Sequence, residues 1–250
     1  MFEFKKLLTM AGHSKWANIK HKKGIADAKR GKVFTKHAKL IALAAQGGSD
    51  PDMNSSLRSA IDNAKADNVP NENIKRAVAK GSGEGGSANQ MAEVKYEGYG
   101  PSGIAMIIEG VTDNKNRTFT NIRTIMSKNG GNLGESGCTA YLFDNRSIIE
   151  LKVVHDKEEQ IMDLIELGAL DVEEGTNNNI VAIVDFQETS NFKEKCKDKY
   201  EIISSRRDMI PQNVTEICDD EVIQKINKLI EKLEDDEDVT DVFTSASLIQ

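Results

Sequence analysis

Apolar positions in the first third of the chain recur at helical spacing. Three stretches place them three or four residues apart, and each stretch is bounded by residues that begin or end helices. Their apolar residues are Val33, Phe34, Ala38, Ile41 and Ala45 before Gly47-Gly48, then Leu57, Ile61 and Ala64 after Asp50-Pro51, then Ile74, Ala77 and Val78 between Asn71 and Gly81. This pattern predicts a small all-helical domain over residues 1–80.

Beyond residues 81–90, which are polar and rich in glycine, the apolar pattern becomes one of strands alternating with helices. We interpret 81–90 as a flexible linker. Strands are predicted at 94–97, 104–109 and 139–143. A helix is predicted between the second and third of these strands, and its inward-facing residues are Phe119, Ile122, Ile125 and Met126. At the end of the chain, residues 209–217, a helix with Val222, Ile226, Leu229, Ile230 and Leu233, and a strand at 239–244 supply a β-α-β half.

Between these two parts the order is β-α-β-β-α-β, the split βαβ or ferredoxin-like arrangement. Its predicted strands are 148–153, 170–173, 180–186 and 201–205, and its helices are 158–167 and 189–199. The expected fold class is therefore α/β (α+β) with three domains. They are a helical domain at 1–80, a discontinuous α/β domain at 91–145 and 206–250, and a second ferredoxin-like α/β domain inserted at 146–205.

The charge of the chain is distributed unevenly. Its 33 basic and 40 acidic residues give a formal charge of −7, which by itself argues against a polyanionic partner. The first 46 residues, however, carry eleven Lys or Arg and only two acids, a net of +9, so the other 204 residues carry −16. A basic arm on an acidic body is typical of proteins that bind polyanions through that arm.

Four lysines in the basic segment share one face of the predicted helix, because they are spaced three, four and three residues apart: Lys29, Lys32, Lys36 and Lys39. Ahead of them, Lys15, Lys20, Lys22 and Lys23 surround Trp16, which either stacks on a base or anchors the segment on its helices. We expect these residues to bind phosphates of nucleic acid. Reversing the four lysines to Glu together is expected to abolish binding without unfolding the protein.

Two further charged segments lie in the α/β part. Residues 112–118, Thr-Asp-Asn-Lys-Asn-Arg-Thr, precede a helix that Asp113, Asn114 or Asn116 can cap. With Lys115, Arg117 and Arg123 nearby, the same helix N-terminus is a candidate secondary anion site. The acidic run 234–238 is interpreted as a solvated helix end that repels phosphates and so restricts their contact to the N-terminal domain.

Catalytic, metal and cofactor motifs are not found in the sequence. Two matches to G-x-G-x-x-G begin at Gly81 and Gly98, but neither lies between a strand and a helix, and we interpret them as linker and β-turn. The four histidines and the cysteines Cys138, Cys196 and Cys218 match no ligand spacing. No apolar run approaches the ~18 residues of a membrane span. We expect a cytoplasmic, non-enzymatic protein with reduced thiols and with no metal, cofactor or membrane contact.

Several longer motifs resemble those of the YebC/PmpR family. They are Met-Ala-Gly-His-Ser-Lys-Trp-Ala-Asn-Ile-Lys-His-Lys-Lys from Met10, Asp-Ala-Lys-Arg-Gly-Lys-Val-Phe-Thr-Lys from Asp27, Tyr-Glu-Gly-Tyr-Gly-Pro from Tyr96, residues 112–118, and Gly-Gly-Asn-Leu-Gly from Gly130. The resemblance runs from Met10 to about Val242. It implies three domains, no catalysis, and a bacterial cytoplasmic protein with a mitochondrial counterpart. It also implies a basic surface formed by His13, Lys15, Lys20, Lys22, Lys23, Lys29, Arg30, Lys32, Lys36 and Lys39. Because residues 1–9 precede the family's usual start, Met1 and Met10 are both candidate initiators.

The resemblance leaves two functions open. One is a DNA-binding transcriptional regulator, and the other is a translation factor that binds the ribosome, ribosomal RNA or mRNA, as the family's mitochondrial activator of cytochrome c oxidase subunit I synthesis does. No helix presents Arg, Asn and Gln together on one face, and a lysine stripe carries little base information. That composition mildly favours RNA or a ribosomal surface. The expectation is therefore a nucleic-acid-binding regulator of gene expression, in transcription or, as the alternative, in translation.

Overall fold

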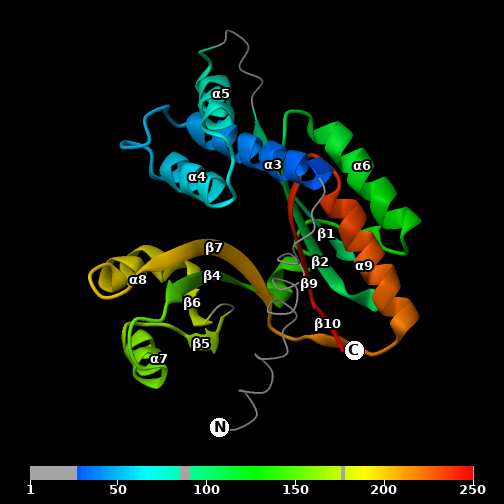
Figure 1. Ribbon diagram of the computed structural model, residues 1–250. Helices are drawn as coiled ribbons and strands as arrows, with labels where there is room; N and C mark the ends of the chain where they lie inside the picture. The colour runs from blue at the N-terminus through cyan, green and yellow to red at the C-terminus, as the bar shows by residue number, and fades with distance from the viewer. Residues whose placement is uncertain (1–26, 85–90, 176–177, 250) are drawn as a thin grey trace. The chain divides into compact units, whose positions relative to one another are not determined.

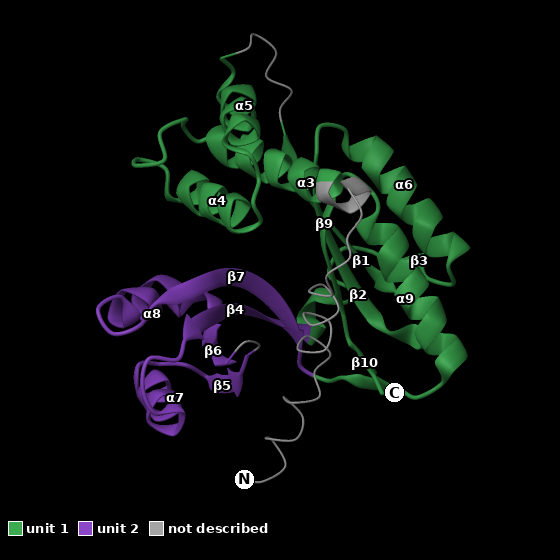
Figure 2. Cartoon of the chain, in the orientation of Figure 1, with its two compact units in different colours: residues 1–142, 213–250 green, residues 143–212 purple. Residues whose placement is uncertain are grey.

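The computed structural model describes residues 27–84, 91–175 and 178–249 (Figure 1). Contacts divide the chain into two compact units: residues 1–142 with 213–250 form unit 1, and residues 143–212 form unit 2 (Figure 2). Both units contain sheets with helices packed on them, which confirms the predicted α/β (α+β) class. The helices of the first third belong to unit 1, so the division into three domains stays a prediction. The predicted linker 81–90 falls largely on residues 85–90, which lie outside the described residues.

Unit 1 begins with three helices, α3 (Asp27–Ala45), α4 (Ser55–Ala66) and α5 (Asn71–Ser82). α4 is capped by Asn54, whose side chain accepts a hydrogen bond from the backbone N–H of Leu57 at 3.0 Å. α5 runs past Gly81 and ends on Gly83, which has the left-handed φ of +80°. The predicted helix end at Gly81 was therefore wrong. Gly81 lies where α5 crosses α3, and a Cβ there would sit 2.1 Å from the carbonyl oxygen of Ala42.

The apolar faces predicted from helical spacing pack together in one cluster. Its buried members are Ile41, Ala45, Leu57, Ile61, Ala64, Val69, Ile74 and Ala77. α3 has a second apolar contact, because Ala42, with Leu40 and Leu43 beside it, packs against Met91 and Val111 at the sheet of unit 1. α3 is therefore held by apolar packing on two sides.

The main sheet of unit 1 is antiparallel with the strand order β3-β1-β2-β9. Its strands are β1 (Ala92–Tyr99), β2 (Ala105–Thr112), β3 (Asn132–Leu133) and β9 (Val239–Thr244), and β8 (Thr215–Ile217) pairs in parallel with β10 (Ala246–Leu248). The short helix η1 (Pro101–Gly103) joins β1 to β2, and the backbone N–H of Gly103 donates to the carbonyl oxygen of Gly100 at 3.1 Å. These two glycines confirm the predicted β-turn, whereas Gly98 lies within β1. α6 (Lys115–Lys128) and α9 (Asp220–Glu234) cover one face of this sheet and bury Ile122, Met126, Ile226 and Leu229 against it (Figure 1).

Phe119 does not point into this core as predicted. Its side chain is 43% exposed, and its ring lies 6.0 Å from that of Tyr96, centre to centre. The inward position of this helical turn is taken by Thr118, which is fully buried. The residue that spacing placed in the core is therefore displaced by a hydrogen-bonding neighbour.

A buried carboxylate organises the loop that follows β3. Glu97 is only 5% exposed and accepts hydrogen bonds from the backbone N–H groups of Gly137, Thr139 and Ala140 at 2.9, 2.8 and 2.7 Å. Burial raises the pKa of Glu97, but these hydrogen bonds outweigh burial and lower the pKa below its usual value. The predicted strand at 139–143 was wrong, because this segment forms the short helix η2 (Ala140–Leu142), and Thr139 and Ala140 at its start donate backbone hydrogen bonds to Glu97.

Unit 2 has the predicted β-α-β-β-α-β order with the antiparallel strand order β5-β6-β4-β7. Its strands are β4 (Phe143–Lys152), β5 (Asp171–Glu174), β6 (Asn179–Asp185) and β7 (Ile202–Pro211), and its helices are α7 (Lys157–Glu166), α8 (Thr189–Cys196) and the short η4 (Phe186–Glu188). Both long helices pack on one face of the sheet and bury Leu164, Phe192 and Cys196 against Ile149 and Ala182.

The strands of unit 2 extend beyond the predicted bounds of 146–205. β4 pairs with β7 from Phe143 opposite Pro211 to Leu151 opposite Ile202, so the inserted segment is 143–212. β4 begins with the buried Phe143, but the next three residues are polar, and Arg146 forms ion pairs with Asp144 and Asp185 at 3.0 and 2.7 Å. Backbone hydrogen bonds hold this part of the strand without an apolar pattern, so the apolar pattern of the sequence did not predict that the strand begins here.

Candidate nucleic-acid interface

The predicted basic surface is described only in part. His13, Lys15, Trp16, Lys20, Lys22 and Lys23 lie outside the described residues. Lys29 and Arg30 belong to α3, but only their backbone is described. Lys32, Lys36 and Lys39 are described in full, and we call them the lysine face of α3. The geometry of the site is therefore built on these three residues and their surroundings.

Two lysines of this face are bound by carboxylates of the same chain. Lys32 Nζ lies 2.6 Å from Asp235 Oδ1, and Lys39 Nζ lies 2.5 Å from Asp238 Oδ1. Lys39 also donates to the backbone carbonyl oxygen of Glu237 at 2.8 Å. The acidic run 234–238, which we call the acidic loop, thus lies against the lysines that were expected to meet phosphates.

Asp238 is the buried centre of this contact, with a side chain only 4% exposed. Besides Lys39, it accepts hydrogen bonds from Thr118 Oγ1 at 2.7 Å, Arg117 Nη2 at 3.0 Å and Thr112 Oγ1 at 3.2 Å. Burial raises the pKa of Asp238, but the hydrogen bonds from Lys39, Thr118 and Arg117 outweigh burial and lower the pKa to about 2. The carboxylate is therefore charged over the whole physiological range.

Backbone contacts fix the acidic loop where α9 meets β9. The backbone N–H of Asp238 donates to Asp236 Oδ1 at 2.9 Å, and the backbone N–H of Val111 donates to the carbonyl oxygen of Asp238 at 2.8 Å. Gly110 permits this approach, because a Cβ on it would lie 2.3 Å from that carbonyl oxygen. The interpretation of the run as a solvated helix end was therefore wrong for Asp238.

The candidate anion site at the start of α6 is filled by the chain itself. Asn114 caps the helix by accepting from the backbone N–H of Arg117 at 3.1 Å. The Arg117 guanidinium binds Asp113 at 2.9 Å as well as Asp238, so the anion at this helix N-terminus is a carboxylate of the protein. Lys115 and Arg123 are both exposed but eight residues apart, roughly 12 Å along the helix, which is too far for one phosphate to contact both.

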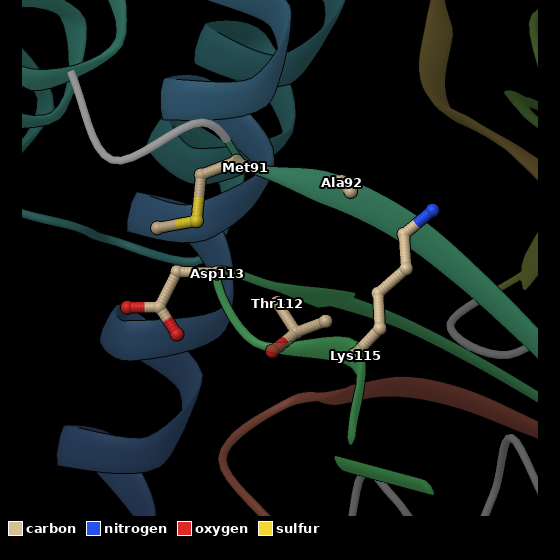
Figure 3. Close-up of a pocket in the computed structure, with 5 residues that line it drawn as sticks. All are labelled: Met91, Ala92, Thr112, Asp113 and Lys115. Atoms are coloured by element: carbon tan, nitrogen blue, oxygen red, sulfur yellow. The ribbon is translucent and has the colours of Figure 1, made fainter. Parts of the chain in front are cut away.

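The pockets beside these residues are lined by charges of both signs. One, of about 390 Å³, is lined by Met91, Ala92, Thr112, Asp113 and Lys115, and the charged ends of Asp113 and Lys115 point to opposite sides of it (Figure 3). A second, of about 450 Å³, brings Lys39, Lys80 and Arg117 together with Asp113, Asp236, Glu237 and Asp238. Because carboxylates outnumber the cations there, this pocket does not favour an added anion.

The acidic loop is the part of the site that sequence reasoning missed. Spacing identifies the lysine face, but Lys32 and Asp235 are 203 positions apart, and Lys39 and Asp238 are 199 apart. The signal that was present is compositional, because five consecutive acids stand in a chain with one dense cluster of lysines. Unlike charges of that density attract each other, and the fold brings them together.

The described residues contain neither a metal-binding cluster nor a membrane-spanning helix. Within residues 27–84, 91–175 and 178–249, no group of three or more His, Cys, Asp or Glu side chains is arranged to hold a metal ion. None of the helices described there is both long and apolar enough to cross a membrane. Cys138, Cys196 and Cys218 form no disulfide.

Comparison with known proteins identifies relatives over the whole length of the chain. A "Probable transcriptional regulatory protein YrbC" from Bacillus subtilis is 46% identical over 242 residues, covering 94% of this chain and 99% of the relative. A "Probable transcriptional regulatory protein" from Syntrophomonas wolfei is 46% identical over 246 residues, covering 96% and 97%. The crystal structure of a conserved hypothetical protein, Aq1575, from Aquifex aeolicus superimposes with a TM-score of 0.82 at 40% identity, covering 95% of this chain and 98% of that one.

Two family models together match most of the chain. The TACO1/YebC protein N-terminal domain matches residues 14–84, and the TACO1/YebC second and third domain matches residues 91–246. The boundary between the two matches falls within the glycine-rich segment identified from the sequence. The resemblance inferred from the motifs is confirmed: the chain belongs to the TACO1/YebC family.

Proposed function

We propose that this protein regulates gene expression by binding the phosphate backbone of nucleic acid through its basic N-terminal segment, without catalysing a reaction. The observation that carries the proposal is the net charge of +9 over residues 1–46 on a body of −16. The relatives named as probable transcriptional regulatory proteins support the regulatory part. We assign this role to the cytoplasm, where the three unpaired cysteines stay reduced.

The ion pairs of α3 support assigning this role to the cations that precede Lys32. Lys39 is bound by a buried carboxylate and is therefore assigned to the fold, and Lys32 is paired at the surface. The binding set is thus weighted toward the residues ahead of Lys32: His13, Lys15, Trp16, Lys20, Lys22, Lys23, Lys29 and Arg30. At a Debye length of about 8 Å, phosphates on that segment are screened from acids held farther away.

The residues Lys115, Arg117 and Arg123 at α6 are a weaker candidate for phosphate binding. Arg117 is held by Asp113 and Asp238, so Lys115 and Arg123 are left as separate exposed cations. They can contact successive phosphates of a strand that already binds the N-terminal segment. We therefore treat them as secondary contacts.

The composition of the basic segment bears on the type of nucleic acid. Ten of the eleven Lys and Arg residues in positions 1–46 are lysines, and the one arginine there is Arg30. Lysine contacts phosphates as a point charge and reads few bases, so the binding we expect is weakly sequence-specific. The second candidate function is therefore that of a translation factor that binds ribosomal RNA or mRNA. Weak sequence specificity favours this function over sequence-specific recognition of promoter DNA.

Salt dependence of binding tests the proposal directly. Affinity for a 20-base-pair DNA duplex and for a 20-nucleotide RNA is measured by fluorescence anisotropy over a salt series. With four to six phosphate contacts, log K should fall with log[salt] at a slope of about −4 to −5 on the duplex and −3 to −4 on the single strand. A slope near zero, or no binding to either probe, would refute the proposal.

A charge-reversal variant locates the surface, and crosslinking identifies the target. The triple variant Lys20→Glu, Lys22→Glu and Lys23→Glu should lose most binding, whereas Lys128→Glu, Lys225→Glu and Lys228→Glu, an equal change at exposed positions, should retain it. Equal losses in both variants would show that binding depends on net charge alone. Crosslinking in cells followed by sequencing then separates promoter DNA, which supports transcription, from ribosomal RNA or mRNA, which supports translation.

A further inference from the structure

The lysine face of α3 and the acidic loop form two ion pairs of different character. The Lys39–Asp238 pair is buried, with side chains 16% and 4% exposed, while the Lys32–Asp235 pair is open to solvent, with side chains 41% and 39% exposed. The two pairs lie on the same face of the same helix, because Lys32 and Lys39 are two turns apart. One loop therefore covers this face firmly at one end and loosely at the other.

The buried end does not open without loss of the fold around it. Asp238 accepts from Thr112, Arg117 and Thr118 in addition to Lys39, and its backbone is bonded to Val111. A phosphate that replaced this carboxylate would have to satisfy all four side-chain donors inside the protein. Lys39 is therefore unavailable to nucleic acid.

The exposed end is exchangeable. An ion pair between solvent-exposed side chains adds little stability and is screened by salt. Asp235 is also shared, since Lys232 lies 3.8 Å from its other oxygen, so its charge is not committed to Lys32 alone. Carboxylate and phosphate oxygens are interchangeable acceptors for an ammonium group, so a phosphate can replace Asp235 at Lys32.

The exchange has to take place on a helix that stays in position. α3 packs on both of its apolar sides, against α4 and α5 and against Met91 and Val111. The close crossing of Gly81 over Ala42 further fixes α3 against α5. Lys32 therefore cannot leave the acidic loop by movement of the whole helix, and any polyanion must compete for it directly.

We propose that the acidic loop is an intramolecular competitor of nucleic acid: its Asp235 occupies Lys32 in the unbound protein and yields it to a phosphate, while Asp238 retains Lys39. This inference rests on the proposed function and concerns the regulation of the same surface. The loop lowers affinity for weak or short polyanions, because each must displace Asp235 to gain the Lys32 contact. It also repels a strand from the side of Asp236 and Glu237.

Removing the competitor should tighten binding without changing the number of phosphate contacts, because Lys32 meets a phosphate in both complexes. Asp235→Asn is compared with Glu231→Gln, which makes the same charge change one turn earlier on α9 at an exposed position. With the 20-base-pair DNA duplex at ~0.1 M salt, Asp235→Asn should bind about three- to eightfold more tightly than wild type, with the salt slope unchanged because both complexes neutralise the same number of phosphates. Glu231→Gln should change affinity less than about twofold. Equal affinities of the two variants would overturn the proposal.

An assay without nucleic acid separates this inference from the proposed function. Limiting acetic anhydride labels lysines by accessibility of the free amine, and mass spectrometry reads each site. In the wild type we expect labelling in the order Lys65, Lys32, Lys39, and in Asp235→Asn at least a threefold rise at Lys32 with Lys39 unchanged. If Lys32 labels as fast as Lys65 in the wild type, the loop does not occupy it and the inference fails. If labelling behaves as expected but no variant binds either probe, the proposed function fails instead.

Discussion

Replacing Asp238 by Asn preserves the shape of the side chain but removes the charge that Lys39 and Arg117 share. The size of the effect follows from the pKa of this carboxyl group, which lies at about 2 in the fold against an ordinary value of 3.8. At 1.36 kcal/mol per unit, that difference is worth about 2 kcal/mol of folding stability at neutral pH. The amide also turns an N–H₂ toward groups that are themselves donors, so we expect a total loss of about 2 to 4 kcal/mol.

The pH dependence gives this prediction a second, independent readout. Because the folded pKa is lower than the unfolded one, the charged carboxylate stabilises the fold above pH ~4, and this stabilisation is lost as the pH falls toward 2. The wild type should therefore lose this increment between about pH 4 and pH 2. Asp238→Asn has no group to protonate at this position and should not lose this increment. The free energies of unfolding of the wild type and of Asp238→Asn should therefore converge as the pH falls.

Local measurement is needed because the chain forms two compact units, so its unfolding need not be one two-state transition. Urea titration combined with hydrogen exchange and mass spectrometry follows peptides of α3 and β9 directly. Asp113→Asn is the matched control, since Asp113 also bonds Arg117, at 2.9 Å, but is 32% exposed, and its loss should cost less than ~1 kcal/mol. If Asp238→Asn costs no more than the control, or if the gap between wild type and variant persists unchanged at pH 2, the reasoning is refuted.

Three further changes test other parts of the fold. Gly81→Ala should lower the free energy of unfolding by about 1 to 3 kcal/mol, because its methyl group would overlap the Ala42 carbonyl. Gly31→Ala, which has open space around it, should stabilise α3 by about 0.5 to 1 kcal/mol, and thermal melts compare the two variants. Glu97→Gln should cost about 1 to 3 kcal/mol at pH 7, and because the pKa of Glu97 is lowered, urea melts should show a smaller difference as the pH falls below its ordinary value of 4.5. Phe192→Ala should cost about 3 to 5 kcal/mol, with exchange protection lost in unit 2 and retained in unit 1; equal loss in both would show that the units unfold together.

Much of the fold was predictable because its core elements carry periodic apolar residues. In unit 2, Ile149 and Leu151 are buried in β4 and Ile180, Ala182 and Val184 in β6, and such apolar segments alternating with helical ones indicated the ferredoxin-like order. Element ends were less predictable, since they depend on backbone pairing and on close contacts. Residues 144–146, which follow Phe143 in β4, are polar, and α5 continues through Gly81 where α3 approaches closely.

The candidate site was predictable only as a helix face. The 3.6-residue period places Lys32, Lys36 and Lys39 together whatever the rest of the protein does. The spacing does not predict which groups face these lysines. Asp235 and Asp238 follow α9 and precede β9, and they lie beside the lysines because α9 and α3 both pack on the sheet that contains β9. Partners of a surface charge are a property of tertiary structure.

A count of lysines is therefore not a count of phosphate contacts, and this changes how the lysine face must be tested. Reversing Lys29, Lys32, Lys36 and Lys39 together was expected to abolish binding without unfolding. Lys39→Glu would place a second carboxylate against the buried Asp238, and a close pair of like charges with so little access to water destabilises the fold. Loss of binding in that quadruple variant would thus follow from unfolding as readily as from loss of contacts. Lys32→Gln, which removes only an exposed partner, leaves the buried network intact and reports on phosphate contact alone, as a reduction of about 0.9 in the salt slope on duplex DNA.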